Sequence, residues 1–287
     1  MDFYLFLLRI MKEIRKLIEE GKIDEALEIA AQDDVELLNT AGVSYVRMGE
    51  LVIGERIFRR ILEINPMYER AHYNLGLLYY DLQEYDEAEN EYRKAIRVNP
   101  EYLWAHYNLG NLLFDMERYD EAEHEYRETL GVDFNYWNAH YNLGNLLGIL
   151  GRYDEAENEY REALKITEHS GVHNNLGVLL VKLKRYDDAE REFRDALGIE
   201  PENEAAHNNL ADLLSELKRY GEAEEAYKEA LRIDPEDAGT HCSLGILYSR
   251  TGRGKDSERE FEIAVRLFKQ EGRKLDALAA EKLLNGL

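Results

Sequence analysis

The sequence predicts an all-α protein made of antiparallel helix pairs, and three observations support this fold class. A two-residue motif, in most copies Leu-Gly, returns at a nearly constant interval along the 287 residues. Most intervals also contain Tyr-Asp-Glu-Ala or a close variant, which is typical of the start of a second helix. Four prolines each close one interval, and none interrupts a helical segment. They are Pro66, Pro100, Pro201 and Pro235.

Composition narrows the class of protein further. Hydrophobic residues make up 45% of the chain and charged residues 33%, which is too apolar for a disordered acidic tail and too charged for a membrane protein. The formal net charge of −23 and the lack of a basic run argue against nucleic acid as the main ligand. The single cysteine, Cys242, can form no internal disulfide, which predicts a reducing, cytoplasmic location.

Residues 1–34 are expected to form an N-terminal capping helix pair. Their apolar run, residues 3–8, is much shorter than the roughly 20 residues of a membrane span and lacks the preceding positive charge of a signal peptide. We therefore expect a helix over residues 3–20 that packs its apolar stripe on a neighbour and does not span a membrane. The segment also resembles a degenerate copy of the repeat described next.

The two-residue motif defines seven repeats. Its copies are Ala41-Gly42, Leu75-Gly76, Leu109-Gly110, Leu143-Gly144, Leu176-Gly177, Leu210-Ala211 and Leu244-Gly245. Successive copies are 34, 34, 34, 33, 34 and 34 residues apart. Seven helix-turn-helix repeats are therefore expected over residues 35–271, and residues 272–287 are expected to form a C-terminal capping helix.

Longer motifs recur in register within these repeats. Ala-His-Tyr-Asn-Leu-Gly begins at residues 71, 105 and 139, Tyr-Asp-Glu-Ala at 85, 119 and 153, and Glu-Tyr-Arg at 91, 125 and 159. A 34-residue helix-turn-helix with a small residue after Leu, an early Ala in the second helix and a terminal Pro resembles the tetratricopeptide repeat. The resemblance covers about four-fifths of the chain. It implies a right-handed α-solenoid that binds other proteins.

The glycines of the repeated motif lie in the middle of helices, where Gly costs up to about 1 kcal/mol relative to Ala. A close approach of the second helix is the expected compensation. The small residues predicted to face these glycines are Ala88, Ala122, Ala156, Ala189 and Ala223. Aromatic residues four positions later, such as Tyr126, are predicted to form the larger part of the packing.

Acidic residues gather at the start of the second helices. Asp86, Asp120, Asp154 and Asp187 are each followed three residues later by a glutamate, the spacing of a reciprocal N-terminal cap. Each glutamate precedes an arginine by four residues, as Glu89 precedes Arg93, which favours a helix-surface ion pair. The sequence thus predicts that these acids serve helix capping and solubility.

The sequence predicts no catalytic residue, metal ligand or cofactor. Six histidines occupy the same position of successive repeats, so neighbouring copies are one whole repeat apart and lack the short spacing of a zinc pair. We expect a packing role for them. The chain contains no glycine-rich phosphate loop, nucleophile elbow or His-Glu-x-x-His motif.

The family resemblance implies that the first helices of the repeats line a concave, peptide-binding groove. Residues at spacings of three and four along these helices would face it. The candidate groove residues are Tyr73, Tyr107, Tyr141, Trp104, Asn111 and Asn145. Aromatic faces suit apolar anchors of a peptide or partner helix, although stacking between repeats is the alternative role for these rings.

A second candidate set is an asparagine ladder two residues before the small residue of the motif. Its members are Asn74, Asn108, Asn142, Asn175 and Asn209. An amide offers a donor and an acceptor to a peptide backbone, and the ladder resembles that of the tetratricopeptide region of O-linked N-acetylglucosamine transferase. Residues 1–34 and 272–287 are too few for a glycosyltransferase domain, so that activity is not expected. Hydrogen bonding to the adjacent repeat is the alternative role.

The sequence therefore predicts a non-enzymatic scaffold that holds a peptide segment or helix of a partner protein. A self-associating assembly module, which would use the groove and the terminal helices to form a homo-oligomer, is the alternative. The basic residues of a carboxylate clamp are largely absent from the groove positions, which disfavours chaperone-tail ligands.

Overall fold

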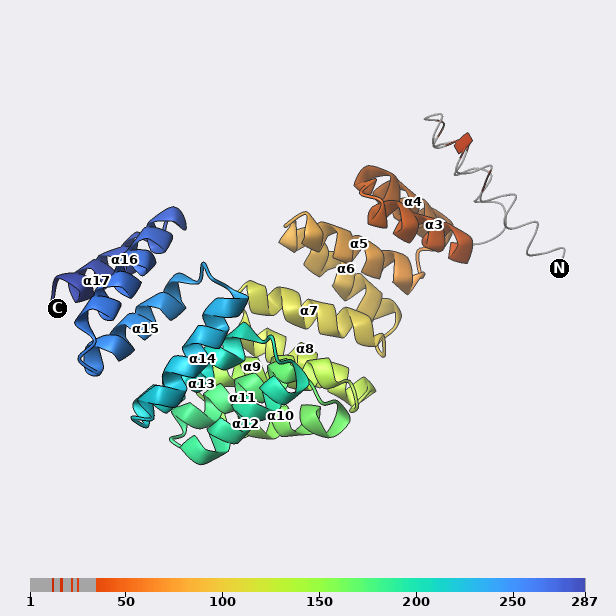
Figure 1. Cartoon of the computed structure of the whole chain (residues 1–287). Helices are drawn as coiled ribbons and strands as arrows, with labels where there is room; N and C mark the ends of the chain where they lie inside the picture. Colours follow the sequence, from red (N-terminus) through yellow and green to blue (C-terminus); the bar gives the residue numbers. More distant parts are fainter. Residues whose placement is uncertain (1–11, 13–15, 18–21, 23–24, 26–34, 287) are drawn as a thin grey trace. The chain divides into compact units, whose positions relative to one another are not determined.

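The computed structural model describes residues 12, 16–17, 22, 25 and 35–286. This part of the chain contains fifteen helices and no strand, so the predicted all-α helix-pair fold is confirmed (Figure 1). The capping pair predicted over residues 1–34 lies outside the described residues, apart from five isolated positions.

Each repeat contributes a first and a second helix. The first helices are α3 (Val35–Arg47), α5 (Glu69–Asp81), α7 (Leu103–Asp115), α9 (Trp137–Ile149), α11 (Ser170–Lys182), α13 (Glu204–Glu216) and α15 (Ala238–Arg250). The second helices are α4 (Leu51–Ile64), α6 (Tyr85–Val98), α8 (Tyr119–Val132), α10 (Tyr153–Ile166), α12 (Tyr186–Ile199), α14 (Tyr220–Ile233) and α16 (Gly254–Gln270). A last helix, α17 (Lys274–Asn285), packs on α16.

The helices form two compact units, Met1–Leu146 and Leu147–Leu287, which we call the N-terminal half and the C-terminal half. In each half the two helices of a repeat pack together, and a second helix also contacts the first helix of the next repeat, as α6 contacts α7 and α12 contacts α13. Within each half, this stacking buries apolar side chains that a single helix pair could not cover by itself.

The motif glycines give the aromatic side chains of the second helices room to pack. A Cβ atom added to Gly110 would lie 2.8 Å from Tyr126 Cδ1, and one added to Gly177 would lie 2.6 Å from Phe193 Cε1. The nearest neighbours of these glycines are therefore aromatic rings rather than the alanines predicted to face them. The rings are almost fully buried, which offsets the helix-propensity cost of Gly.

The second helices begin differently from the prediction. Helix α6 begins at Tyr85, its N-cap residue is Glu84, and no side chain caps it. The predicted reciprocal cap is therefore wrong for Asp86, and the equivalent helices α8, α10 and α12 also lack a side-chain cap. Asp86 instead lies in the first turn, where a carboxylate interacts favourably with the helix dipole.

A glutamate just after this first turn, Glu89, joins neighbouring repeats. The predicted ion pair is confirmed, since Arg93 Nη1 lies 2.7 Å from Glu89 Oε1. Arg118, at the start of the next second helix, also donates to Glu89 Oε2 at 2.7 Å. The C-terminal half repeats this bridge between Arg219 and Glu190 at 2.6 Å. Each bridge ties one second helix to the next.

Candidate functional site

The N-terminal half contains a pocket on its first helices. We call it the N-terminal pocket. It has a volume of about 260 Å³ and is lined by Tyr80, Asn111, Phe114, Asp115, Tyr126, Asn142 and Asn145. The structure thus brings three of the predicted candidates together, namely Asn111, Asn142 and Asn145. Tyr80 and Phe114 add aromatic surface beside the three amides.

Hydrogen bonds fix the floor of the N-terminal pocket. Asn111 Oδ1 accepts from the Tyr126 hydroxyl at 2.9 Å and from Asn142 Nδ2 at 2.8 Å. Tyr126 is 1% exposed, and its burial raises the pKa of the hydroxyl, so Tyr126 stays a neutral donor. At the rim, Tyr80 donates to Asp115. These bonds order the pocket before any ligand binds.

Ladder asparagines hydrogen-bond the preceding repeat. Asn74, Asn108, Asn142 and Asn209 each donate from Nδ2 to a side chain 35 residues earlier. The pairs are Asn74 with Asn39 at 2.7 Å, Asn108 with Tyr73 at 3.1 Å, Asn142 with Tyr107 at 3.0 Å, and Asn209 with Asn174 at 2.8 Å. Asn175 accepts from its neighbour Asn174 at 3.2 Å. The ladder therefore joins successive first helices.

These contacts also fix which end of the amide is left for a ligand. Asn108 Nδ2 donates to the Trp104 carbonyl oxygen at 2.9 Å as well as to Tyr73. A carbonyl can only accept, so the amide orientation is determined and both N–H groups are used. Asn142 Nδ2 likewise makes two hydrogen bonds. The ladder in this half therefore presents carbonyl oxygens.

The predicted groove aromatics pack against other aromatic rings of their own and neighbouring repeats. Tyr73 meets Tyr102 edge-on with ring centroids 5.4 Å apart, and Tyr107 meets Tyr136 in the same way at 5.0 Å. Burial raises the pKa of Tyr73 to about 12. Tyr141 contacts the Trp137 ring. These tyrosines thus stack on neighbouring rings.

Trp104 is the candidate aromatic with the most free surface. It packs edge-on against Tyr136, with ring centroids 5.5 Å apart, but keeps 48% of its area exposed. Large exposed aromatic faces are enriched among the residues that dominate protein interfaces. Trp104 therefore remains a candidate anchor.

The C-terminal half has a pocket at the same repeat positions, which we call the C-terminal pocket. It has a volume of about 410 Å³ and is lined by Asp212, Ser215, Glu216, Tyr227, Ser243, Ile246 and Arg250. Asp212 corresponds to Asn111, three repeats earlier, and Tyr227 corresponds to Tyr126. The Tyr227 hydroxyl donates to Asp212 Oδ1 at 2.5 Å. These residues were not among the candidate site residues, because they do not continue the asparagine ladder.

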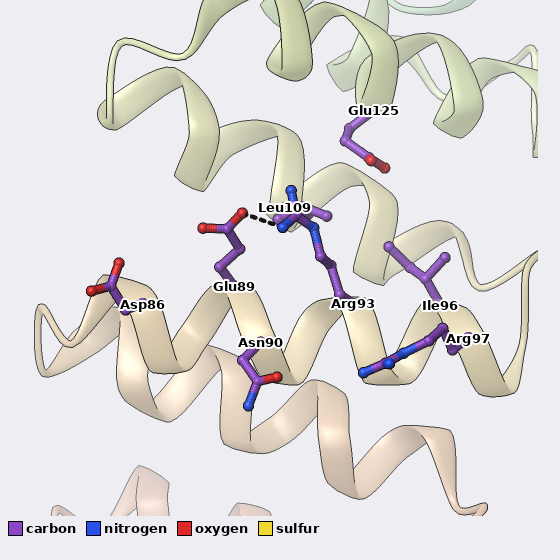
Figure 2. A pocket seen from close by; sticks show the side chains of 8 residues that line it. All are labelled: Asp86, Glu89, Asn90, Arg93, Ile96, Arg97, Leu109 and Glu125. Carbon is purple, nitrogen blue, oxygen red and sulfur yellow. Dashed lines mark ion pairs between the residues drawn. The ribbon is translucent and has the colours of Figure 1, made fainter.

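A third pocket lies among the second helices of the N-terminal half (Figure 2). It has a volume of about 510 Å³, and most of its lining comes from α6, with Leu109 from α7 and Glu125 from α8. Three of its charged side chains already have partners, since Glu89 pairs with Arg93 and Glu125 bonds His106. These three groups of the second-helix pocket are therefore not free for a ligand.

The histidines connect the two helices of a repeat. His106 Nδ1 lies 2.6 Å from Glu125 Oε2, and Nε2 lies 3.0 Å from the Pro100 carbonyl oxygen. His241 makes the same contacts with Glu260 and Pro235, at 2.6 and 3.2 Å. Burial alone disfavours the charged ring, but the two acceptors outweigh it and raise the pKa of both histidines.

One histidine has two acidic neighbours. Ligand atoms of His173, Glu192 and Asp195 lie within 4.8 Å of one another. His173 and Glu192 form the same histidine–glutamate contact as the other repeats, at 2.7 Å. In the repeat of His72 and Glu91, Lys94 occupies the position of Asp195. We therefore assign no metal to this group.

Comparison with known proteins gives the family. A model of the TPR repeat matches residues 76–117, and a model of the tetratricopeptide repeat matches residues 107–170 and 174–238. Together they cover more than half of the chain, which belongs to the tetratricopeptide repeat family. No curated protein matches the sequence significantly.

Solved structures with this fold are numerous. PilF of Pseudomonas aeruginosa aligns with a TM-score of 0.64 and 23% identity over 75% of this chain and 96% of its own. YrrB, described as a TPR protein with an unusual peptide-binding site, aligns with a TM-score of 0.52 and 23% identity over 67% and 97%. A tetratricopeptide repeat protein from Parabacteroides merdae aligns with a TM-score of 0.65 and 19% identity over 88% of this chain and 97% of its own. These similarities establish the solenoid fold.

Proteins of this family generally act through protein–protein interaction. In the described part of the chain, no helix combines the length and apolarity that a membrane crossing requires.

Proposed function

We propose that this protein is a non-enzymatic interaction module that binds a peptide segment of a partner protein along its first helices. The observation that carries the proposal is the N-terminal pocket, in which Asn111, Asn142 and Asn145 meet the aromatic rings of Tyr80 and Phe114. Amides beside aromatic surface can hold a peptide's main chain and one of its side chains together. YrrB, which shares the fold, is described as having a peptide-binding site.

The contacts also define the chemistry of binding. Asn108 and Asn142 already use their N–H groups in hydrogen bonds inside the protein. Their Oδ1 atoms would therefore accept hydrogen bonds from backbone N–H groups of the ligand. Each such bond contributes about 0.5–1.5 kcal/mol net. Ordering the ligand costs more than a few of these bonds supply. An apolar or aromatic side chain in the pocket, beside Phe114, would supply the rest.

The experiment selects ligands from random linear peptides displayed on phage, with the full chain immobilised. Affinity of a selected peptide is then measured by fluorescence anisotropy for the wild type and for the double variant Phe114→Ala, Asn145→Ala. We expect the variant to bind at least about tenfold more weakly, because it loses apolar contact and an amide from the N-terminal pocket. Neither residue belongs to the ladder, so folding is expected to be retained.

The matched control is the double variant Asn90→Ala, Arg97→Ala in the second-helix pocket (Figure 2). It should leave the affinity unchanged. The opposite pattern, with binding lost in the control and kept in the first variant, would place the ligand on the second helices and contradict the proposal. Circular dichroism of both variants verifies that equal amounts of folded protein are compared.

A further inference from the structure

The two first-helix pockets occupy the same repeat positions but differ in chemistry. Asp212 stands where the N-terminal pocket has Asn111, and Ser215 stands where it has Phe114. The C-terminal pocket is also larger, about 410 Å³ against about 260 Å³. A carboxylate has replaced an amide and a hydroxyl has replaced a ring, so the two pockets cannot favour the same side chain.

The acids of the C-terminal pocket have hydrogen bonds but no ion-pair partner among the described residues. Asp212 Oδ1 accepts from the Tyr227 hydroxyl at 2.5 Å, and Glu216 Oε1 accepts from Tyr186 at 3.1 Å. Arg250 also lines the pocket but forms no ion pair with either acid in this part of the chain. Two carboxylates and one guanidinium leave a formal charge of −1, which one added positive charge would neutralise.

Partial loss of hydration adds to the demand for that charge. The Asp212 side chain is exposed to solvent, but nearby protein atoms still reduce its hydration and raise its pKa, against the opposing effect of hydrogen bonds from Tyr227 and Ser243. A carboxylate that has lost part of its hydration without forming an ion pair is stabilised when a cation arrives.

The other walls suit a long aliphatic stem. Ile246 offers apolar surface beside the acids. Lys and Arg pack their methylene groups on such surface while the charged end meets carboxylates. Arg250 can donate to a main-chain carbonyl oxygen of the same segment. An acidic side chain would be repelled by Asp212 and Glu216, and a purely apolar one would dehydrate Asp212 without compensation.

We infer that the C-terminal pocket takes a basic side chain, Lys or Arg, of a bound peptide segment. This inference rests on the proposed function and adds to it the chemical class of one ligand residue. The N-terminal pocket, which has an amide and aromatic floor, would take an apolar or aromatic side chain instead.

The test uses peptides selected from the same displayed library on the full chain. We expect Lys or Arg to be enriched at one peptide position. Replacement of that residue by norleucine, which keeps an unbranched aliphatic stem but lacks the charged end, should weaken binding about tenfold. Asp212→Asn gives the C-terminal pocket the amide that the N-terminal pocket has at Asn111. In this variant, replacing the basic peptide residue by norleucine should no longer weaken binding; we call the loss of affinity on this replacement the norleucine penalty. Glu216→Gln should reduce the penalty in part. Unfolding by urea verifies that both variants are folded.

The matched control is Glu225→Gln, which changes net charge by the same amount at an exposed position of α14 outside the pocket. It should keep the full norleucine penalty. Selected peptides without a preferred basic residue, or a penalty that survives in both Asp212→Asn and Glu216→Gln, would overturn the inference while leaving peptide binding itself intact. If no peptide is enriched at all, both this inference and the proposed function fail.

Discussion

The two halves of the chain use one packing scheme to present two different pockets. Tyr126 and Tyr227 occupy the same position and donate to a first-helix residue fifteen positions earlier. The acceptor is Asn111 in one half and Asp212 in the other. A tyrosine hydroxyl can donate equally well to an amide oxygen or a carboxylate. The core therefore tolerates a change of charge in the pocket, and packing and specificity depend on different residues.

If the two halves share one packing scheme, substitutions in their cores should destabilise them equally. The largest expected loss of stability, from overpacking at a motif glycine, tests this. Gly110→Leu and Gly177→Leu should each destabilise the protein by about 1–3 kcal/mol or more through overpacking. The added Cβ atoms alone would approach Tyr126 and Phe193 within 3.0 Å. Urea unfolding followed by circular dichroism measures the change.

Two exposed helical glycines provide the matched controls. A Cβ atom at Gly131 or Gly198 would have no neighbour within 4 Å. Replacement by Ala should leave the free energy of unfolding unchanged or raise it by up to about 1 kcal/mol, because Ala is the better helix former. A Gly177→Leu variant as stable as the wild type would show that the C-terminal core is looser than the N-terminal core.

The asparagine ladder should differ in strength between the halves. Asn142 donates twice, to Tyr107 and Asn111, whereas Asn209 donates once, to Asn174. Asn142→Ala is expected to cost about 1–2 kcal/mol and Asn209→Ala about half as much. Urea unfolding of both variants checks the ratio. Equal costs would indicate that packing rather than hydrogen bonding sets the contribution of the ladder.

Much of this architecture could be predicted from the sequence. The 34-residue interval placed the helix pairs, and the aromatic residue after each early alanine, such as Tyr126, proved to be the main packing partner of the motif glycine. Local spacing also predicted the pair between Glu89 and Arg93. These features depend on helix periodicity, which a single sequence displays directly.

The partners of the contacts between repeats were beyond the same reasoning. The bond from Arg118 to Glu89 spans 29 residues, and the bond from Asn108 to Tyr73 spans 35. Such distances depend on how adjacent helices are offset along their axes, which periodicity alone leaves open. The capping prediction for Asp86 failed because the N-cap residue is Glu84, two residues earlier. That Asp212 and Arg250 line one pocket depends on packing between repeats, which local spacing does not reveal.

A smaller, pH-dependent effect should be shared by both halves. The folded protein raises the pKa of His106 and His241, so their stabilisation is fully present below the unfolded pKa of about 6.5. It should disappear as the pH rises through the folded pKa values. Urea unfolding between about pH 6 and pH 9 should therefore show decreasing stability. The effect is modest because burial opposes the charged ring.

The variants Glu125→Gln and Glu260→Gln separate the contribution of His106 to the pH dependence of stability from that of His241. Each removes the carboxylate that favours the charged form of its histidine, so each should flatten part of the pH dependence. His207→Gln is the control, since Ala226 stands where the other repeats place the glutamate. A pH profile that neither glutamate variant alters would assign the dependence to other groups.

The smallest expected effect concerns the bridges between second helices. Arg118→Met removes the bond to Glu89 and should cost about 0.2–1 kcal/mol at low ionic strength, because the arginine is partly exposed. The cost should shrink in about 1 M NaCl, where the Debye length is near 3 Å. Arg219→Met tests the equivalent bridge to Glu190, and its cost in stability should shrink with salt in the same way.

The control is Arg97→Met, which removes an exposed arginine that forms no ion pair among the described residues. Its effect on stability should show no such salt dependence. Should all three variants respond equally to salt, the bridges would contribute only through net charge, and the stacking of repeats in both halves would rest on the buried aromatic and ladder contacts alone.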